Sequence, residues 1–147
     1  MSDQKTIAVL EITRIIKANR NDVFDALTQP EKMYDWFYGM PEGYAKVTND
    51  LKPGGEYVIE MFGTGDGKKE GCSDYAPHGV YKEIDPPSRL VFTWVSEGFV
   101  DHSTVTIDLK DHDEGTELIL KHELPESVVE PHTQGWNVCL DHLVEIF

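Results

Sequence analysis

Apolar and polar residues alternate along most of the chain between Tyr44 and Leu124, in short segments separated by turn residues. Successive side chains of a β-strand point to opposite faces, so each segment would have one apolar face and one polar face. An earlier segment over 7–18 is rich in β-branched residues, which also favour strands. Strands joined directly by turns favour antiparallel pairing, because parallel pairing needs long crossover connections. The clearest later strands are expected over 57–61, 78–84, 90–94, 105–109 and 118–122.

Two short helices are predicted directly after the first strand. Asn21 is a favourable N-cap for a helix that contains Val23, Phe24 and Leu27. The segment Thr28–Glu31 then has the form of a capping box, with a proline early in the helix where its missing N–H is tolerated.

A long helix is predicted at the C-terminus, from about Glu130 to Phe147. Trp136, Leu140 and Leu143 recur at helical spacing and continue to Phe147 as one apolar stripe. We expect this stripe to face the sheet and the opposite positions to face water: Gln134, Asn137 and Asp141.

The order of these elements predicts an α+β fold in two layers, with a sheet of six or seven strands and one long helix against its apolar face. A helix is about 10 Å wide, whereas strands are spaced ~4.8 Å apart, so one helix cannot cover such a sheet. Part of the inward apolar surface should therefore border a cavity between the sheet and the helix. Cavities of this kind usually hold apolar ligands.

The candidate cavity residues are large, mostly aromatic or aliphatic side chains at inward positions. For most of them, ordinary core packing explains the pattern equally well. His122, Tyr57 and Tyr81 have a second interpretation, as polar groups that would orient a ligand inside the cavity. The candidates are Trp36, Phe37, Tyr57, Ile59, Met61, Tyr81, Phe92, Trp94, Val105, Leu120, His122, Trp136 and Leu140.

Composition and charge limit the number of domains, the classes of partner and the location that we expect for this protein. The 147 residues fit one domain over 1–147, and a chain of this size needs neither a disulfide nor a metal to hold its core. The net charge of −14 disfavours nucleic acid and anionic lipid surfaces. No segment approaches the ~20 apolar residues of a membrane span, and the polar start is unlike a signal peptide. We expect a cytoplasmic protein, a monomer or weak dimer, with Cys72 and Cys139 reduced.

The sequence shows no motif for metal, nucleotide or nucleophilic chemistry. Gly63–Lys69 is too short for a phosphate-binding loop and has Lys69 where a hydroxyl residue belongs. Several histidines are ten residues apart, a spacing that places no pair on one helical face. Cys139 sits among apolar helix residues, where burial raises a thiol pKa and lowers its reactivity. We therefore predict no catalytic residues, no metal and no cofactor.

Five segments of the chain, taken together, resemble the bacterial Hsp90-ATPase-activator-homologue family, a branch of the SRPBCC or START superfamily. They are ITRIIKANRNDVFDALTQPEKMYDWF, DLKPGGEYVIEM, GVYKEIDPPSRLVFTW, GTELILKHEL and QGWNVCLDHLVEIF. The resemblance implies the helix-grip fold, in which a curved antiparallel sheet surrounds a long C-terminal helix over a cavity. It says less about activity, because this superfamily includes lipid carriers, hormone receptors and polyketide cyclases.

Three functions follow as hypotheses. The first is non-catalytic binding of a hydrophobic small molecule or lipid in the cavity. The second is a co-chaperone-like interaction module for Hsp90. The eukaryotic co-chaperone has a further domain for which 147 residues leave no room, so we do not expect direct stimulation of Hsp90. The third is a cyclase-like or hydrolase-like enzyme.

Overall fold

The structure is a computed structural model that describes residues 6–34, 36, 44–62, 77–95 and 103–147. For Tyr44, Ala45, Met61, Phe62 and Pro131 it describes the backbone alone.

The elements follow the predicted order of strand, two short helices, antiparallel strands and one long helix. Strand β1 (Ile7–Ile16) is followed by helix α1 (Arg20–Thr28) and helix α2 (Pro30–Met33). A short 3-10 helix, η1 (Glu126–Val128), then leads into helix α3 (Val129–Glu145). Between α2 and η1 lie the strands β2 (Tyr44–Asn49), β3 (Glu56–Phe62), β4 (His78–Asp85), β5 (Arg89–Thr93), β6 (Thr104–His112) and β7 (Gly115–Pro125).

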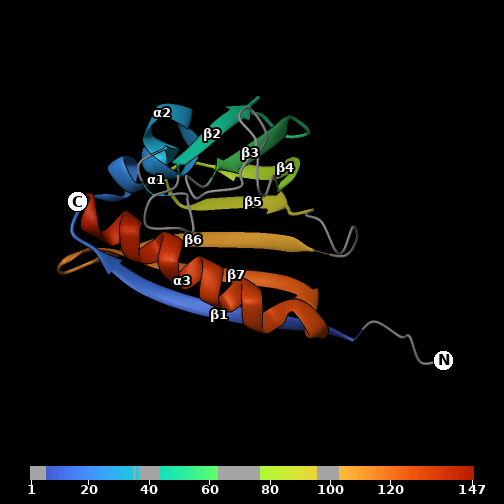
Figure 1. Cartoon of the computed structure of the whole chain (residues 1–147). Coiled ribbons are helices and arrows are strands. Elements are labelled where there is room, and N and C mark those ends of the chain that lie inside the picture. Colours follow the sequence, from blue (N-terminus) through green and yellow to red (C-terminus); the bar gives the residue numbers. More distant parts are fainter. Residues whose placement is uncertain (1–5, 35, 37–43, 63–76, 96–102) are drawn as a thin grey trace.

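The sheet has seven strands in the order β1-β7-β6-β5-β4-β3-β2, and every pair is antiparallel. Strands β2 to β7 form a meander, and β1 joins it beside β7 over its full length, from the pair Ile7–Pro125 to the pair Ile16–Thr116. The sheet curves around one side of α3 (Figure 1). This confirms the predicted α+β helix-grip fold.

Helix α3 covers only part of the inner face of the sheet, on the side of β1. It lies against β1 and crosses the neighbouring strands β7 and β6 (Figure 1). Helix α2 packs against β2, and α1 contacts α2, β6 and β7. Trp136, Leu140 and Leu143 are buried against the sheet, as predicted. Asp141 is exposed, but Asn137 is half-buried, because its side-chain oxygen accepts a hydrogen bond of 2.7 Å from Arg14. The prediction that Asn137 faces water was therefore wrong.

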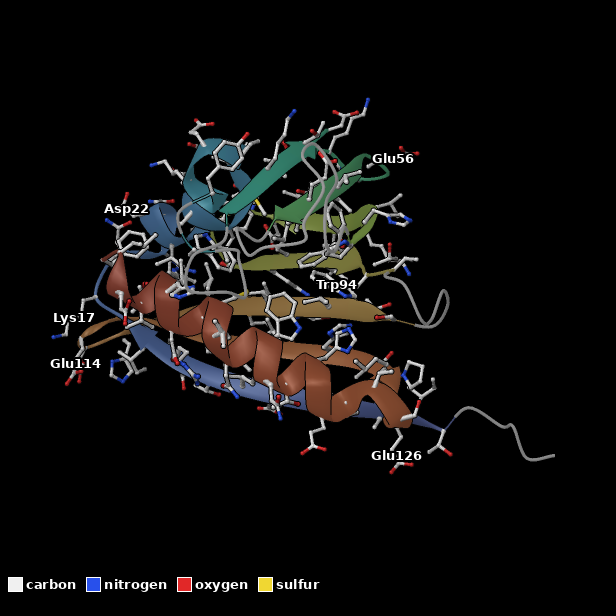
Figure 2. All side chains as sticks on the ribbon, viewed as in Figure 1. Lys17, Asp22, Glu56, Trp94, Glu114 and Glu126 are labelled. Carbon is white, nitrogen blue, oxygen red and sulfur yellow. The ribbon has the colours of Figure 1, made fainter. Side chains whose placement is uncertain are left out.

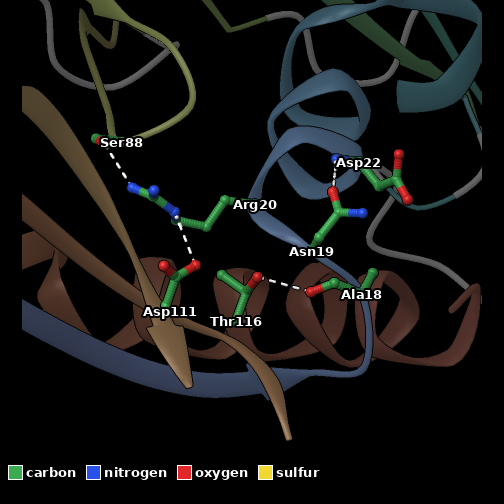
Figure 3. A network of polar contacts seen from close by, with 7 residues as sticks. All are labelled: Ala18, Asn19, Arg20, Asp22, Ser88, Asp111 and Thr116. Carbon is green, nitrogen blue, oxygen red and sulfur yellow. Dashed lines mark hydrogen bonds and ion pairs between the residues drawn. The ribbon is translucent and has the colours of Figure 1, made fainter. Parts of the chain in front are cut away.

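Both short helices begin differently from the prediction. Helix α1 is capped by Asn19 and not by Asn21, because the Asn19 side chain accepts the Asp22 N–H at 2.9 Å (Figure 3). Helix α2 begins at Pro30 without a side-chain cap. Thr28 cannot cap it, because its hydroxyl donates to the Phe24 carbonyl inside α1.

A polar network anchors the start of α1 to two turns of the sheet (Figure 3). Arg20 donates to Ser88, in the turn between β4 and β5, at 2.7 Å, and to Asp111 near the β6–β7 turn at 3.0 Å. Thr116 donates to the Ala18 carbonyl at 2.7 Å. Next to it, Gly115 has a φ of +136° and packs so closely that a Cβ there would lie 2.2 Å from the Ile16 carbonyl oxygen. These contacts fix the position at which the chain passes from β1 into α1.

Candidate functional site

A cavity lies under α1 and α2 and beside α3, which contributes one of its walls. Its walls on the strands β3 to β6 are Tyr57, Ile59, Tyr81, Leu90, Phe92 and Ile107. Its other walls are Leu27 of α1, Met33 of α2, Trp36 in the turn after α2 and Trp136 of α3. The cavity has a volume of about 20 Å³, within a recess of about 330 Å³ that includes space open to solvent.

Among the described residues, the lining carries no charged side chain. Its strand wall is an aromatic cluster, in which the Tyr57 ring lies 5.5 Å from both Tyr81 and Phe92. The series of rings continues from Phe92 to Trp94 at 6.5 Å and from Trp94 to Trp136 at 5.1 Å. Figure 2 shows Trp94 on the face of the sheet toward α3. The site therefore favours an uncharged, apolar or aromatic molecule.

The structure brings some of the predicted cavity residues together and separates others. Trp36, Tyr57, Ile59, Tyr81, Phe92 and Trp136 all line the cavity. Phe37 lies outside the described residues, and the side chain of Met61 is not described. The remaining candidates are buried but do not line this cavity: Trp94, Val105, Leu120, His122 and Leu140.

The cavity was predicted between the sheet and the C-terminal helix, and Trp136 is the residue of α3 that borders it. Val105, Leu120 and Leu140 are 0% exposed and do not line it. Sequence reasoning missed four lining residues. Leu90 and Ile107 were detectable from the alternation of their strands, and Leu27 and Met33 from the apolar faces of the two short helices.

His122 is a fully buried histidine whose two ring nitrogens both have partners. Its Nδ1 lies 3.0 Å from the Trp136 indole nitrogen, and its Nε2 lies 2.7 Å from the Ser103 hydroxyl. An indole N–H only donates, so Nδ1 accepts and the ring proton is on Nε2, which donates to Ser103. Burial, together with the nearby His132, lowers the pKa of His122 to about 3. The ring is thus neutral, and its hydrogen-bonding capacity is used within the protein.

The Ser103–His122 pair has the composition of a nucleophile and its base, but its tautomer is unsuitable. A histidine that activates serine must accept the hydroxyl proton at the nitrogen facing it. Here that nitrogen carries the proton, and the partner of Nδ1 is the Trp136 N–H in place of an orienting carboxylate. The pair joins the residue before β6 to β7, and the bond from Trp136 to His122 attaches α3 to β7.

The two tyrosines of the lining use their hydroxyl groups differently. Tyr57 donates to the Thr93 carbonyl at 2.5 Å. Tyr81 accepts a hydrogen bond of 3.0 Å from the Asn49 amide, which also donates to the Thr28 carbonyl at the end of α1. Burial raises the pKa of Tyr81, so its hydroxyl keeps its proton.

Other candidate chemistry has no site among the described residues. They contain no group of three His, Cys, Asp or Glu side chains placed to bind a metal ion. Burial raises the pKa of the Cys139 thiol to about 12, which leaves it unreactive. In this part of the chain, no helix has the length and hydrophobicity needed to cross a membrane. Cys72, His102 and the segment 63–69 lie outside the described residues.

Solved structures with the same fold cover almost the whole chain. Protein CV1439 from Chromobacterium violaceum is 23% identical, with a TM-score of 0.80, 94% of this chain covered and 95% of the other. Protein NE0264 from Nitrosomonas europaea is 24% identical, with a TM-score of 0.76 and coverage of 93% and 92%. An AHSA1-like protein from Aeromonas hydrophila is 20% identical, with a TM-score of 0.78 and coverage of 94% and 90%. At these identities the likeness establishes the fold alone.

The sequence itself supplies the family. No curated protein matches the chain. A family model described as "Activator of Hsp90 ATPase homolog 1-like protein" matches residues 17–147, which include both short helices, the sheet from β2 to β7 and α3. This match confirms the resemblance carried by the five sequence segments. The chain belongs to the family of activator of Hsp90 ATPase homolog 1-like proteins.

Proposed function

We propose that this protein binds a small, uncharged apolar or aromatic molecule in the cavity under α1 and α2, without changing it chemically. The observation that carries the proposal is the lining: aromatic and aliphatic side chains from four strands and three helices converge there, with no charged group among them. Ligand cavities in proteins are mostly apolar with a few polar groups that fix orientation, and this lining has that composition.

The size of the cavity limits the ligand. A volume of about 20 Å³ holds one or two water molecules, since one needs roughly 10–15 Å³. An organic ligand must therefore displace side chains or shift α2. Met33 is suited to this, because an unbranched thioether chain repacks easily. We favour a ligand with a single aromatic ring over a membrane lipid, because a lipid would require a far larger rearrangement.

Binding without chemistry is favoured by the positions of the titratable groups. The part of the lining that the structure describes contains no carboxylate, histidine or lysine that could transfer a proton. His122 is outside the lining, and both of its nitrogens are bound within the protein. A cyclase-like or hydrolase-like reaction would need such a group at the ligand.

Contact with a chaperone is the second candidate function, favoured by the description of the matching family. It makes a different demand on the molecule, because it needs an exposed contact surface and not an empty interior. We rank it second because the described structure is distinguished by its apolar cavity. A stimulation of an Hsp90 ATPase that persists when the cavity is filled would reverse this ranking.

The proposal is tested by filling the cavity. Ile107 borders the cavity, and Ile107→Phe places the additional ring atoms in the empty space. We expect the hydrocarbon α-methylstyrene to quench tryptophan fluorescence and raise the melting temperature of the wild type. At 100 times Kd the gain in stability should be about 2.7 kcal/mol. In Ile107→Phe both effects should disappear while the protein remains folded.

Leu109→Phe is the matched control, because Leu109 is the next inward residue of β6 and does not line the cavity. It should lose about 1–3 kcal/mol of stability through overpacking and still bind the hydrocarbon. Absence of binding to the wild type, or equal binding to Ile107→Phe, would refute the proposal.

A further inference from the structure

The hydroxyl proton of Tyr81 has no acceptor among the described residues, although the side chain is only 3% exposed. The oxygen of this hydroxyl accepts the Asn49 amide, and that amide is fixed by its second hydrogen bond, of 2.7 Å, to Thr28. Buried donors in proteins are nearly always paired. An unused donor in the wall of a cavity is therefore a candidate contact for a ligand.

Both polar groups of the Tyr81 backbone are hydrogen-bonded. Its N–H donates to the Gly55 carbonyl at 2.8 Å, and its carbonyl accepts the Gly54 N–H at 2.7 Å. The pairing of β4 with β5 shifts register between Tyr81 and Glu83, an irregularity of the kind that often redirects a side chain near a functional site. The ring packs 5.5 Å from Tyr57 and 6.4 Å from Phe92. The hydroxyl is thus fixed in position before any ligand binds.

The other polar candidates do not offer such a group. The Tyr57 hydroxyl donates to Thr93, and both nitrogens of His122 are engaged by Ser103 and Trp136. None of the described lining residues is cationic, so beside them a carboxylate ligand would be buried without a counter-charge. The acceptor that matches Tyr81 is therefore an uncharged oxygen.

We propose that Tyr81 donates a hydrogen bond to the ligand, and that the ligand class is an aromatic or apolar molecule with one carbonyl or ether oxygen. This inference rests on the proposed binding function and adds the chemistry that selects the ligand. It assigns Tyr81 as the residue that orients the ligand and Asn49 as the residue that positions Tyr81.

Two probes of nearly equal shape test the inference. Acetophenone carries a carbonyl where α-methylstyrene carries a methylene group, so only the first can accept a hydrogen bond. Both are titrated into the wild-type protein and into Tyr81→Phe. We expect Tyr81→Phe to weaken acetophenone binding about tenfold, the usual order for a lost hydrogen bond in a buried site, and to change the α-methylstyrene affinity less than about twofold. The carbonyl stretching frequency of bound acetophenone should be lower in the wild type than in Tyr81→Phe.

Tyr57→Phe is the matched control. It removes a hydroxyl from the same wall, but one that is bonded to Thr93, so it should affect both probes equally. If α-methylstyrene binds and Tyr81→Phe leaves acetophenone unaffected, the inference fails while the proposed function stands. If neither probe binds the wild type, the proposed function fails and the inference fails with it.

Discussion

The inner face of the sheet, which the helices cover, has two sides: one lies under α3 and the other under α1 and α2. Both are built from alternating strands, but different helices cover them. Under α3, Leu118, Leu120, Leu140 and Leu143 are all 0% exposed, and we call this part the filled side. Under α1 and α2, the inward residues of β3 to β6 border a cavity. The difference comes from the covering elements: α3 is one helix of 17 residues, whereas α1 and α2 have 9 and 4 and are joined at Gln29.

The buried polar groups of the two sides also differ, in whether their hydrogen-bonding capacity is used within the protein. On the filled side, the buried imidazole of His122 is satisfied by Ser103 and Trp136. On the cavity side, Tyr81 keeps a hydroxyl proton that no described residue accepts. We expect the filled side to serve stability and the cavity side to serve the proposed binding. Function in this fold is thus expected where the cover of the sheet is interrupted. The first of the following substitutions changes both sides, and the others change one side each.

Trp136→Ala should have the largest effect, because Trp136 contributes to both sides. Its ring lines the cavity, and its indole N–H donates to His122. We expect a loss of about 3–5 kcal/mol in the free energy of unfolding, measured with urea. Trp136→Phe keeps most of the apolar contact and should lose clearly less. An unchanged unfolding midpoint in Trp136→Ala would contradict the assignment of α3 as the main cover of the sheet.

The sequence predicted the fold well because strand alternation and helical periodicity are local signals. Leu118, Leu120 and His122 alternate along β7, and the stripe from Trp136 to Leu143 faces the sheet. It also identified Tyr57, Tyr81 and Phe92 as candidates that the structure gathers around the cavity.

The position of the cavity could not be predicted in this way. It depends on which strands α3 crosses, and this is decided by packing between distant parts of the chain. The distinction between Tyr57 and Tyr81 was equally hidden, because their partners, Thr93 and Asn49, are 36 and 32 residues away in sequence. The periodicity of a strand shows that a side chain points inward, but not which partner its polar atoms find.

The filled side should also make the protein sensitive to acid. Burial lowers the pKa of His122 from 6.5 to about 3, so the unfolded state binds the proton more readily between these values. The stability contributed by neutral His122 is complete above about pH 6.5 and decreases as the pH falls toward 3. At pH 5 the loss should be about 2 kcal/mol relative to neutral pH.

Urea unfolding at pH 7 and pH 5 measures this loss. His122→Gln should reduce the difference between the two pH values, whereas His112→Gln, on an exposed hairpin, should leave it unchanged. His132 contributes in the same direction, because burial also lowers its pKa. The same pH dependence in His122→Gln and the wild type would show that His122 is not the sensitive group.

The smallest effects on stability are expected from substitutions of Arg14 and Arg20, which connect the covering helices to the sheet. Arg14 binds Asn137 and Asp141 of α3 at 2.7 and 3.3 Å, and Arg20 joins the start of α1 to Ser88 and Asp111 (Figure 3). Both arginines are partly exposed, so replacing either by Met should cost no more than about 1 kcal/mol.

The kinetics of binding should nevertheless separate these two substitutions. We expect a ligand larger than the cavity to enter when α1 and α2 shift, and the Arg20 contacts hold the start of α1 in place. Arg20→Met should therefore increase the association and dissociation rates of α-methylstyrene together and change Kd little, because the contacts of the bound state are unaltered. Arg14→Met releases a contact of the filled side and should leave both rates unchanged. Stopped-flow quenching of tryptophan fluorescence measures both rates, and equal acceleration by the two substitutions would show that the ligand does not pass beneath α1 and α2.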